Sequence, residues 1–243
     1  MKPTEGGRDF QVEGEMLLVD KPLDWTSFDV VKKIRSLFNV KKVGHAGTLD
    51  PKASGLLIVC TGKRTKSLES FLNAEKEYTG TFELGVRTPS FDSETAVTET
   101  SPYTDVTPVV LEQAVQKFRG KVLQVPPMYS AAKKDGRPLY SYARDGVNVE
   151  RSAKEIEIVD FRITRFAPPM AKFRVVCSKG TYIRSLIDDL GNELGCGCTL
   201  RSLRRIRIGS YTVEHAMTIQ DLVTLRQTLE SRHRQHDEVG QPA

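Results

Sequence analysis

Apolar positions along the chain recur at two spacings, which predict a mixture of helices and strands. Residues 27–38 carry apolar side chains every three or four positions, the spacing of a helix with one buried face, and Thr26 or Ser27 can cap its start. Short apolar runs such as 16–19 and 56–61 predict buried strands. Helices are predicted at residues 27–38, 63–74 (with Leu68, Phe71 and Leu72 facing inward), 107–120, 139–144, 182–194 and 218–229. Strands are predicted at residues 16–19, 56–61, 77–84, 122–125, 155–164, 172–177 and within 199–208.

Several of these strands follow one another without a helix between them. This order favours an α+β fold with a mixed or largely antiparallel sheet over a doubly wound parallel sheet. Residues 1–14 are polar and are expected to form a flexible N-terminus, and residues 231–243 a polar, frayed tail. Residues 15–230 form one predicted domain. Within it, residues 126–153 are basic and tyrosine-bearing and are predicted to leave the core as an insertion.

The charge of the chain is compatible with a nucleic-acid partner. The 243 residues include 36 basic and 31 acidic ones, with a formal net charge of +5 and a pI near 9.0. Basic residues form clusters, which also suit solvated helix faces. The clusters are Lys32-Lys33-Arg35, Lys41-Lys42, Lys63-Arg64-Lys66, Lys133-Lys134-Arg137 and Arg201-Arg204-Arg205-Arg207.

The cysteines and the apolar runs predict a reducing, cytoplasmic location. Cys60 and Cys177 sit in apolar runs and are expected to be core thiols, whereas Cys196 and Cys198 lack the second ligand pair that a zinc site needs. The chain opens without a secretory signal pattern, and no apolar run approaches membrane-spanning length. We therefore expect neither a membrane partner nor a bound metal.

Residues 42–57 are the most informative part of the sequence. They place one histidine, one aspartate, three glycines and one proline between two apolar runs. Glycine and proline at this density interrupt helices and strands, so the segment is predicted to be a shaped loop that presents His45 and Asp50. The structural alternative is that Asp50 only caps a helix that begins at Pro51, since an Asp-Pro pair is common at helix entries.

Nucleotide-binding loops are not supported by the sequence. Gly62-Lys63 superficially suggests a phosphate-binding loop, but Leu57 stands where its first glycine is required. Gly195-Cys196-Gly197 lacks the third glycine of a dinucleotide fingerprint, because Leu200 stands there. A kinase or redox function therefore has no support.

Six segments in order resemble the TruB family of tRNA pseudouridine synthases, over about residues 16–211. The loop around Asp50 and the segment that ends at Arg184 are each fairly specific. The resemblance implies the pseudouridine synthase catalytic fold, a bent mixed sheet with flanking helices and a central RNA-binding cleft. The six segments are residues 21–27 (KPLDWTS), 42–57, 76–78 (KEY), 125–131 (VPPMYSA), 177–184 (CSKGTYIR) and 200–205 (LRSLRR).

The resemblance implies a role for individual residues. Asp50 matches the catalytic carboxylate, and Arg184 matches an arginine that keeps it charged and oriented. Tyr78 matches an aromatic that stacks on a base flipped out of folded RNA, although core packing is the alternative for this side chain. Tyr182 and Leu203 match positions that line the uracil pocket, and His45 matches a histidine that contacts the RNA near the extruded nucleotide.

The implied reaction is the isomerisation of uridine 55 in the T-loop of tRNA. Nothing is oxidised and no group is imported in this reaction, so no cofactor is expected. The expected partner is the T-arm of tRNA, gripped by the insertion at residues 126–153, and the protein is expected to be a monomer. Two alternatives stay open, namely an RNA-guided synthase that modifies ribosomal RNA and a non-catalytic RNA-binding or RNA-folding module.

Two features depart from the pattern of the family. Asp24 stands where the first segment usually has glycine, and aspartate tolerates left-handed backbone better than most residues, so we expect the turn to be kept. Only 34 residues follow Gly209, which is too few for the further RNA-binding domain that many relatives carry. The sequence therefore predicts a short form, and this argues against the RNA-guided alternative.

Overall fold

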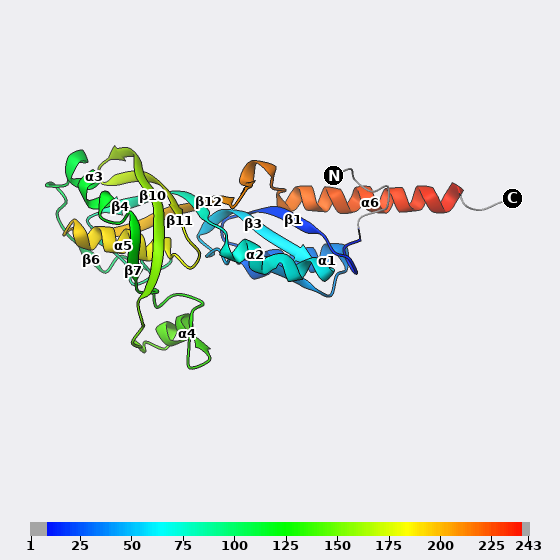
Figure 1. Ribbon diagram of the computed structural model, residues 1–243, viewed down its shortest axis with the longest axis horizontal. Helices are drawn as coiled ribbons and strands as arrows, with labels where there is room; N and C mark the ends of the chain where they lie inside the picture. The colour runs from blue at the N-terminus through cyan, green and yellow to red at the C-terminus, as the bar shows by residue number, and fades with distance from the viewer. Residues whose placement is uncertain (1–8, 240–243) are drawn as a thin grey trace. The chain divides into compact units, whose positions relative to one another are not determined.

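The computed structural model describes residues 9–239, and for residues 232–239 the backbone alone. The chain divides into two compact units, residues 1–73 together with 206–243, and residues 74–205. Figure 1 shows the elements of both units in chain order. Each unit is described by itself below.

The first unit is built around strand β3 (Ala53–Thr61). Strand β1 (Met16–Lys21) and strand β2 (Val43–Ala46) both pair with it antiparallel, through Leu17↔Val59 and His45↔Val59 respectively. Nearly all residues of β3 are buried, so both faces of this strand are covered. Burial of both faces explains why the sequence of β3 carries a continuous apolar run and does not alternate.

Helix α1 (Ser27–Phe38) covers this part of the sheet, and the sequence predicted its bounds. Thr26 caps its start in a capping box with Asp29, and Asn39 ends it in the left-handed conformation. Ile34 lies in a buried apolar cluster with residues of β1 and β3. Phe10 belongs to the same cluster and stacks on Phe38, with ring centroids 4.1 Å apart.

The N-terminal segment is more ordered than its composition predicts. Residues 9–14 form a turn in which the Asp9 carboxylate accepts backbone hydrogen bonds from Gln11, Val12 and Glu13. Burial of Phe10 fixes this turn to the core. The rest of the expected flexible N-terminus, residues 1–8, lies outside the described residues, and the predicted domain boundaries stay a prediction.

The single helix predicted at residues 63–74 was wrong in its first part. A 3-10 turn (Gly62–Ser67) comes first, followed by the short helix α2 (Leu68–Asn73), in which no residue is fully buried. Leu68 packs on Gly44 of β2, but Leu72 is 42% exposed. Leu68 and Phe71 are the half-buried apolar side chains of α2, with the Phe71 ring centroid 5.6 Å from that of Tyr211, whereas Leu72 lies outside this narrow face.

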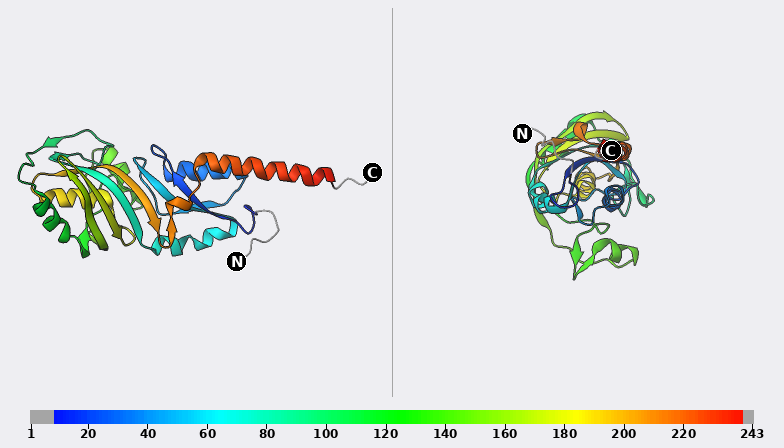
Figure 2. Two further views of the ribbon diagram at one scale, coloured as in Figure 1. Left: turned by 90° about the horizontal axis from the view of Figure 1, so that it is seen from above. Right: turned by 90° about the vertical axis from the view of Figure 1, so that its right-hand side faces the viewer.

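The last helix is longer than expected. Strand β13 (Tyr211–Thr212) pairs with the end of β12 (Cys198–Ile208), and a 3-10 turn (Val213–His215) leads to α6 (Ile219–Val239). We expected the helix to end near Leu229, but it continues to Val239, as the left-hand view of Figure 2 shows. The sequence has no glycine or proline between Ile219 and Gly240, so nothing stops the helix earlier.

The second unit is an antiparallel sheet with helices packed on it. Its strands lie in the order β12, β4 (Lys76–Leu84), β11 (Met170–Cys177), β10 (Lys154–Ala167) and β7 (Gly120–Gln124). The β4–β11, β11–β10 and β10–β7 ladders are all antiparallel. Helix α3 (Pro108–Gln116) packs on β10 and on α5 (Ile183–Glu193). A two-stranded ribbon, β5 (Val86–Arg87) with β6 (Glu99–Thr100), completes the unit.

The insertion at residues 126–153 leaves the sheet of the second unit between β7 and β10 (Figure 1). It contains the hairpin β8 (Lys133–Lys134) and β9 (Arg137–Pro138), followed by α4 (Leu139–Arg144), the short helix that the sequence predicted at these residues. Arg151 Nη1 donates to the carbonyl oxygen of Pro126 at 3.0 Å, so the two ends of the insertion are joined.

The α+β class with flanking helices and a mainly antiparallel sheet is confirmed, whereas the central cleft stays a prediction. Cys60 and Cys177 are buried in the core as predicted, and Cys196 and Cys198 are buried as well. Helix α3 ends at Gln116, earlier than the predicted stop at Gly120, because Gly120 already opens β7 with φ 90°.

Burial on α1 predicts a contrast between two of its residues. Ile34 is fully buried, so Ile34→Ala should lower the free energy of unfolding by about 2–5 kcal/mol. Phe28, on the same helix, is 53% exposed, and Phe28→Ala should cost less than about 1 kcal/mol. Urea unfolding followed by circular dichroism measures both, and equal effects would contradict the packing described here.

Candidate active site

Asp50 lies in a short loop, residues 47–52, between β2 and β3. The loop is shorter than predicted, because the flanking residues 43–46 and 53–57 belong to the strands. A turn follows Asp50, in which Ala53 N–H donates to the carbonyl oxygen of Asp50 at 3.0 Å, and β3 begins directly after it. No helix starts at Pro51, so the helix-cap alternative for Asp50 is contradicted.

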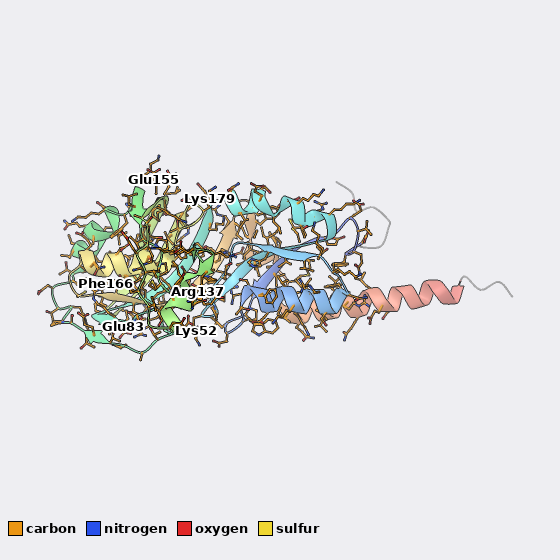
Figure 3. The ribbon with its side chains drawn as sticks, turned by 90° about the horizontal axis from the view of Figure 1, so that it is seen from below. Lys52, Glu83, Arg137, Glu155, Phe166 and Lys179 are labelled. Carbon is orange, nitrogen blue, oxygen red and sulfur yellow. The ribbon has the colours of Figure 1, made fainter. Side chains whose placement is uncertain are left out.

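Residues 24–27 hold this loop by hydrogen bonds. The Ser27 hydroxyl accepts a hydrogen bond from Leu49 N–H at 2.9 Å, and Asp24 N–H donates to the carbonyl oxygen of Pro51 at 2.8 Å. Asp24 has φ 63°, so the left-handed turn expected at this position is kept. Its carboxylate pairs with Lys52 Nζ at 2.7 Å (Lys52 is labelled in Figure 3).

His45 lies on β2 rather than on the loop, opposite Val59, and is half-buried. It therefore belongs to the strand that leads into the loop. The backbone of His45 is held by the pairing of β2 with β3, whereas the sequence predicted that His45 would lie in the loop.

Arg184 is a buried arginine in the first turn of α5. Its side chain is 4% exposed, and its guanidinium donates to the carbonyl oxygens of Ser90 at 3.0 Å and of Tyr129 at 2.7 Å. It also forms an ion pair with Asp92, with 3.6 Å between Arg184 Nε and Asp92 Oδ2. A buried cation needs such acceptors, because the loss of hydration would otherwise disfavour its charge.

Asp92 is a residue that the sequence reasoning missed. It lies in a polar stretch that was predicted only as a loop, yet its side chain is 5% exposed. Ser90 Oγ donates to it at 2.6 Å and Glu94 N–H donates to it at 2.9 Å. No feature of the sequence separates Asp92 from the other acidic residues of this loop.

Tyr182 is the residue before α5, and two hydrogen bonds with the side chain of Gln124 hold its backbone. Tyr182 N–H donates to Gln124 Oε1 at 2.8 Å, and Gln124 Nε2 donates to the carbonyl oxygen of Tyr182 at 3.1 Å. Next to it, Ser185 Oγ donates to the carbonyl oxygen of Val125 at 3.2 Å. The start of α5 therefore fixes the end of β7, from which the insertion leaves.

Tyr78 and Leu203 lie on neighbouring strands of the second unit, β4 and β12, and each is 8% exposed. Two further cationic residues, which were not predicted as site residues, lie two positions away on the same strands. Lys76 is 6% exposed and Arg205 is 1% exposed. Alternate residues of a strand share a face, so Lys76 shares one with Tyr78 and Arg205 one with Leu203.

Burial lowers the pKa of Lys76 from 10.5 to about 8, and the positive charges of Arg205 and Lys179 act in the same direction. Lys76 Nζ donates to the carbonyl oxygen of Ala74 at 2.7 Å. The cations of β4, β12 and the turn after β11, where Figure 3 labels Lys179, therefore lie close enough to influence one another.

The predicted site residues belong to both units. His45 and Asp50 are in the first unit, and Tyr78, Tyr182, Arg184 and Leu203 are in the second. The pairing of Asp50 with Arg184 stays a prediction. Among the side chains of residues 9–231 we find no cluster that could ligate a metal ion. Within residues 9–239 no helix has the length and hydropathy needed to span a membrane.

Comparison with solved structures identifies the class of fold. A crystal structure of an archaeal box H/ACA sRNP Nop10-Cbf5 complex aligns with 90% of this chain and 55% of that chain, at 27% identity and a TM-score of 0.67. A Cbf5-Nop10-Gar1 complex aligns with 86% of this chain and 53% of that one, at 32% identity and a TM-score of 0.68. The chain thus spans about half the length of these structural relatives, and it has the pseudouridine synthase fold.

The chain belongs to the TruB family of pseudouridylate synthases. The family model of the TruB N-terminal domain matches residues 35–183, and that of the tRNA pseudouridylate synthase B C-terminal domain matches residues 184–241. The tRNA pseudouridine synthase B of Flavobacterium johnsoniae is 48% identical over 86% of this chain and 94% of the relative. That of Chloroherpeton thalassium is 45% identical over 87% of this chain and 90% of the relative.

The lowered pKa of Lys76 predicts a dependence of stability on pH. Between about pH 8 and pH 10.5 the unfolded chain binds this proton and the folded chain does not, so Lys76 makes stability rise with pH. Below pH 8 both states bind the proton, and its burial destabilises the fold by about 1–3 kcal/mol. Lys76→Met should therefore be more stable than the wild type below pH 8, with the difference shrinking toward pH 10.5. Urea midpoints of both proteins measure it, and a difference independent of pH would contradict the prediction.

Proposed function

We propose that this protein is a tRNA pseudouridine synthase that isomerises uridine 55 in the T-loop. The observation that carries the proposal is the family match across residues 35–183, which include the Asp50 loop. Two tRNA pseudouridine synthase B relatives, 45–48% identical to this chain over most of their own lengths, support the same conclusion. The match is supported by a fold in which a glycine-shaped loop presents a carboxylate. Position 55 is the substrate that the family resemblance implies.

The reaction breaks the bond between ribose C1′ and uracil N1, turns the base, and forms a bond between C1′ and C5. The hydrogen of C5 leaves as a proton and N1 gains one, so the product is an isomer of the substrate. An ionised carboxylate in a closed site suits this chemistry, as nucleophile or as base toward the nucleoside. Asp50 is that carboxylate in our proposal.

Arg184 would keep Asp50 ionised and oriented. Its guanidinium is buried and held by the carbonyl oxygens of Ser90 and Tyr129, which leaves its position fixed before RNA binds. A cation of fixed position orients a carboxylate beside it and costs no reorganisation during the reaction. Asp92, already paired with Arg184, would fix the guanidinium further.

The target base must leave its stack before Asp50 can reach it. Tyr78 would stack on the flipped uracil, Tyr182 and Leu203 would line its pocket, and His45 would contact the RNA beside it. Tyr78 is 8% exposed, and Tyr182 is held by Gln124 at the start of α5, so both would be positioned before the base enters.

The insertion at residues 126–153 would close on the T-arm of the tRNA. Lys133 and Lys134 form one strand of its hairpin, and Arg144 ends its helix. Arg137 pairs with Asp145 and lies over the ring of Tyr142, 4.4 Å from its centroid. This mixture of cations and aromatic rings suits phosphate contacts that give affinity and little sequence information. The protein would act as a monomer in the cytoplasm and without a cofactor.

Asp50→Asn tests the proposal. The amide keeps the size of the side chain and removes its charge, so tritium release from tRNA labelled at uridine C5 should fall by at least about 1,000-fold. Binding to the same tRNA, measured by filter retention, should stay within about threefold. Near-normal turnover in Asp50→Asn would remove Asp50 from the mechanism.

The wild-type assay uses an unmodified tRNA transcript and no other RNA. Release of tritium and mapping of the product to position 55 are expected. Activity that required an added guide RNA would favour the RNA-guided alternative. Binding without any release would favour the non-catalytic one.

Tyr78→Leu should impair turnover more than binding. Leucine fills much of the space but lacks the flat ring on which a base stacks, so single-turnover rates should fall about 10–100-fold. Affinity for tRNA should change by less than about threefold, because phosphate contacts persist. Tyr78→Phe is the matched control and should keep most of the activity. A collapse of binding with normal turnover of bound RNA would exclude the stacking role.

A further inference from the structure

One short segment, residues 24–27, holds the Asp50 loop on both sides. Before Asp50, the Ser27 hydroxyl accepts from Leu49 N–H at 2.9 Å and donates to the carbonyl oxygen of the same residue at 3.2 Å. After Asp50, Asp24 N–H donates to the carbonyl oxygen of Pro51 at 2.8 Å. Both neighbours of the candidate catalytic residue are therefore bonded to the same four residues.

The segment that makes these bonds is itself rigid. Ser27 is the first residue of α1, and the capping box of Thr26 and Asp29 closes this end of the helix. The buried face of α1 packs in the core of the first unit, where Ile34 is fully buried. The position of the Ser27 hydroxyl is thus set by the helix and the core, and not by the loop that it holds.

The chemistry of the contact requires a hydroxyl. Ser27 and Leu49 are 2% and 3% exposed, so water cannot easily replace a lost hydrogen bond between them. A hydroxyl accepts from the peptide N–H of Leu49 and also donates to its carbonyl oxygen, which no apolar side chain of the same size can do. Removal of the hydroxyl would leave two buried peptide groups of the loop without their partner.

Asp24 contributes mainly through its backbone. Its ion pair with Lys52 is exposed, with 69% of the Asp24 side chain and 49% of the Lys52 side chain accessible, so solvent screens it. The peptide N–H of Asp24, directed at Pro51 by the left-handed φ of 63°, needs no side chain. Glycine at this position would make the same bond.

We propose that Ser27 is a positioning residue for Asp50, and that the backbone N–H of Asp24 completes the clamp. The inference rests on the proposed function of Asp50. A reactive carboxylate must be held within about 0.5 Å of its productive position, and a displacement of about 1 Å can cost about 100-fold in rate. Residues 49 and 51 are the points at which such a displacement is prevented.

The test compares Ser27→Ala with Ser27→Thr, which restores the hydroxyl. Under single-turnover conditions, the rate of tritium release from bound tRNA should fall about 10–100-fold in Ser27→Ala and recover at least in part in Ser27→Thr. The Kd for tRNA should stay within about twofold in both variants. If Ser27→Ala does not fold, Ser27→Cys replaces it, and its weaker donor and acceptor should give an intermediate rate.

Thr61→Val is the matched control for lost stability. Thr61 lies in the same unit, is fully buried, and its hydroxyl accepts a hydrogen bond from Glu15 N–H at 2.9 Å. Thr61→Val should lower the melting temperature to a similar degree as Ser27→Ala, while the single-turnover rate should stay within about twofold of the wild type. Asp24→Gly should also stay within about threefold, because it keeps the peptide N–H.

Three results would overturn the inference: a wild-type rate in folded Ser27→Ala, a rate loss no larger than that of Thr61→Val, or a loss confined to RNA affinity. Hydrogen exchange at the amide of Leu49 gives a readout that does not depend on activity. Exchange should be faster in Ser27→Ala and unchanged in Thr61→Val. If the wild type fails to isomerise tRNA while Leu49 exchange responds as expected, the proposed function fails and the clamp itself stands. If Leu49 exchange does not respond, the clamp fails whatever the activity.

Discussion

The buried guanidinium of Arg184 is the constraint on which the second unit depends. A cation taken out of water must be matched by acceptors, and here they come from the carbonyl oxygens of Ser90 and Tyr129 and from the carboxylate of Asp92. Ser90 and Asp92 lie in the loop after β5, Tyr129 lies at the base of the insertion, and Arg184 itself belongs to α5. The guanidinium of Arg184 therefore fixes the positions of the loop after β5 and of the base of the insertion relative to α5.

The same region connects the insertion to the candidate site. Gln124, Val125 and Tyr129 all bond to the first residues of α5, and Arg151 closes the far end of the insertion onto Pro126. A movement of the insertion on RNA would act first on these bonds. The base of the insertion is thus joined to the residues expected to bind the substrate, while its hairpin and helix carry the exposed cations.

In the first unit, hydrogen bonds hold a polar loop at the edge of an apolar core. Strand β3 is buried between β1 and β2, and the loop that precedes it carries Asp50. Ser27 and Asp24 supply the hydrogen bonds that the loop backbone needs, and α1 fixes Ser27 in place. The unusual aspartate at residue 24 fits because its backbone adopts φ 63°, and its side chain adds an exposed ion pair with Lys52.

The sequence by itself determined most of the longer elements and the identity of the family. Local signals were sufficient for the bounds of α1, with its cap at Thr26, because capping and periodicity act over a few residues. Only the tertiary structure decided that no residue of α2 is fully buried, that Phe10 is in the core, and that Asp92 partners Arg184. Burial and ion pairing depend on residues distant in sequence; β7, β10 and β11, for example, lie between Asp92 and Arg184 in the chain. The sequence therefore predicts which residues carry the chemistry, and the tertiary structure determines which contacts hold those residues in place.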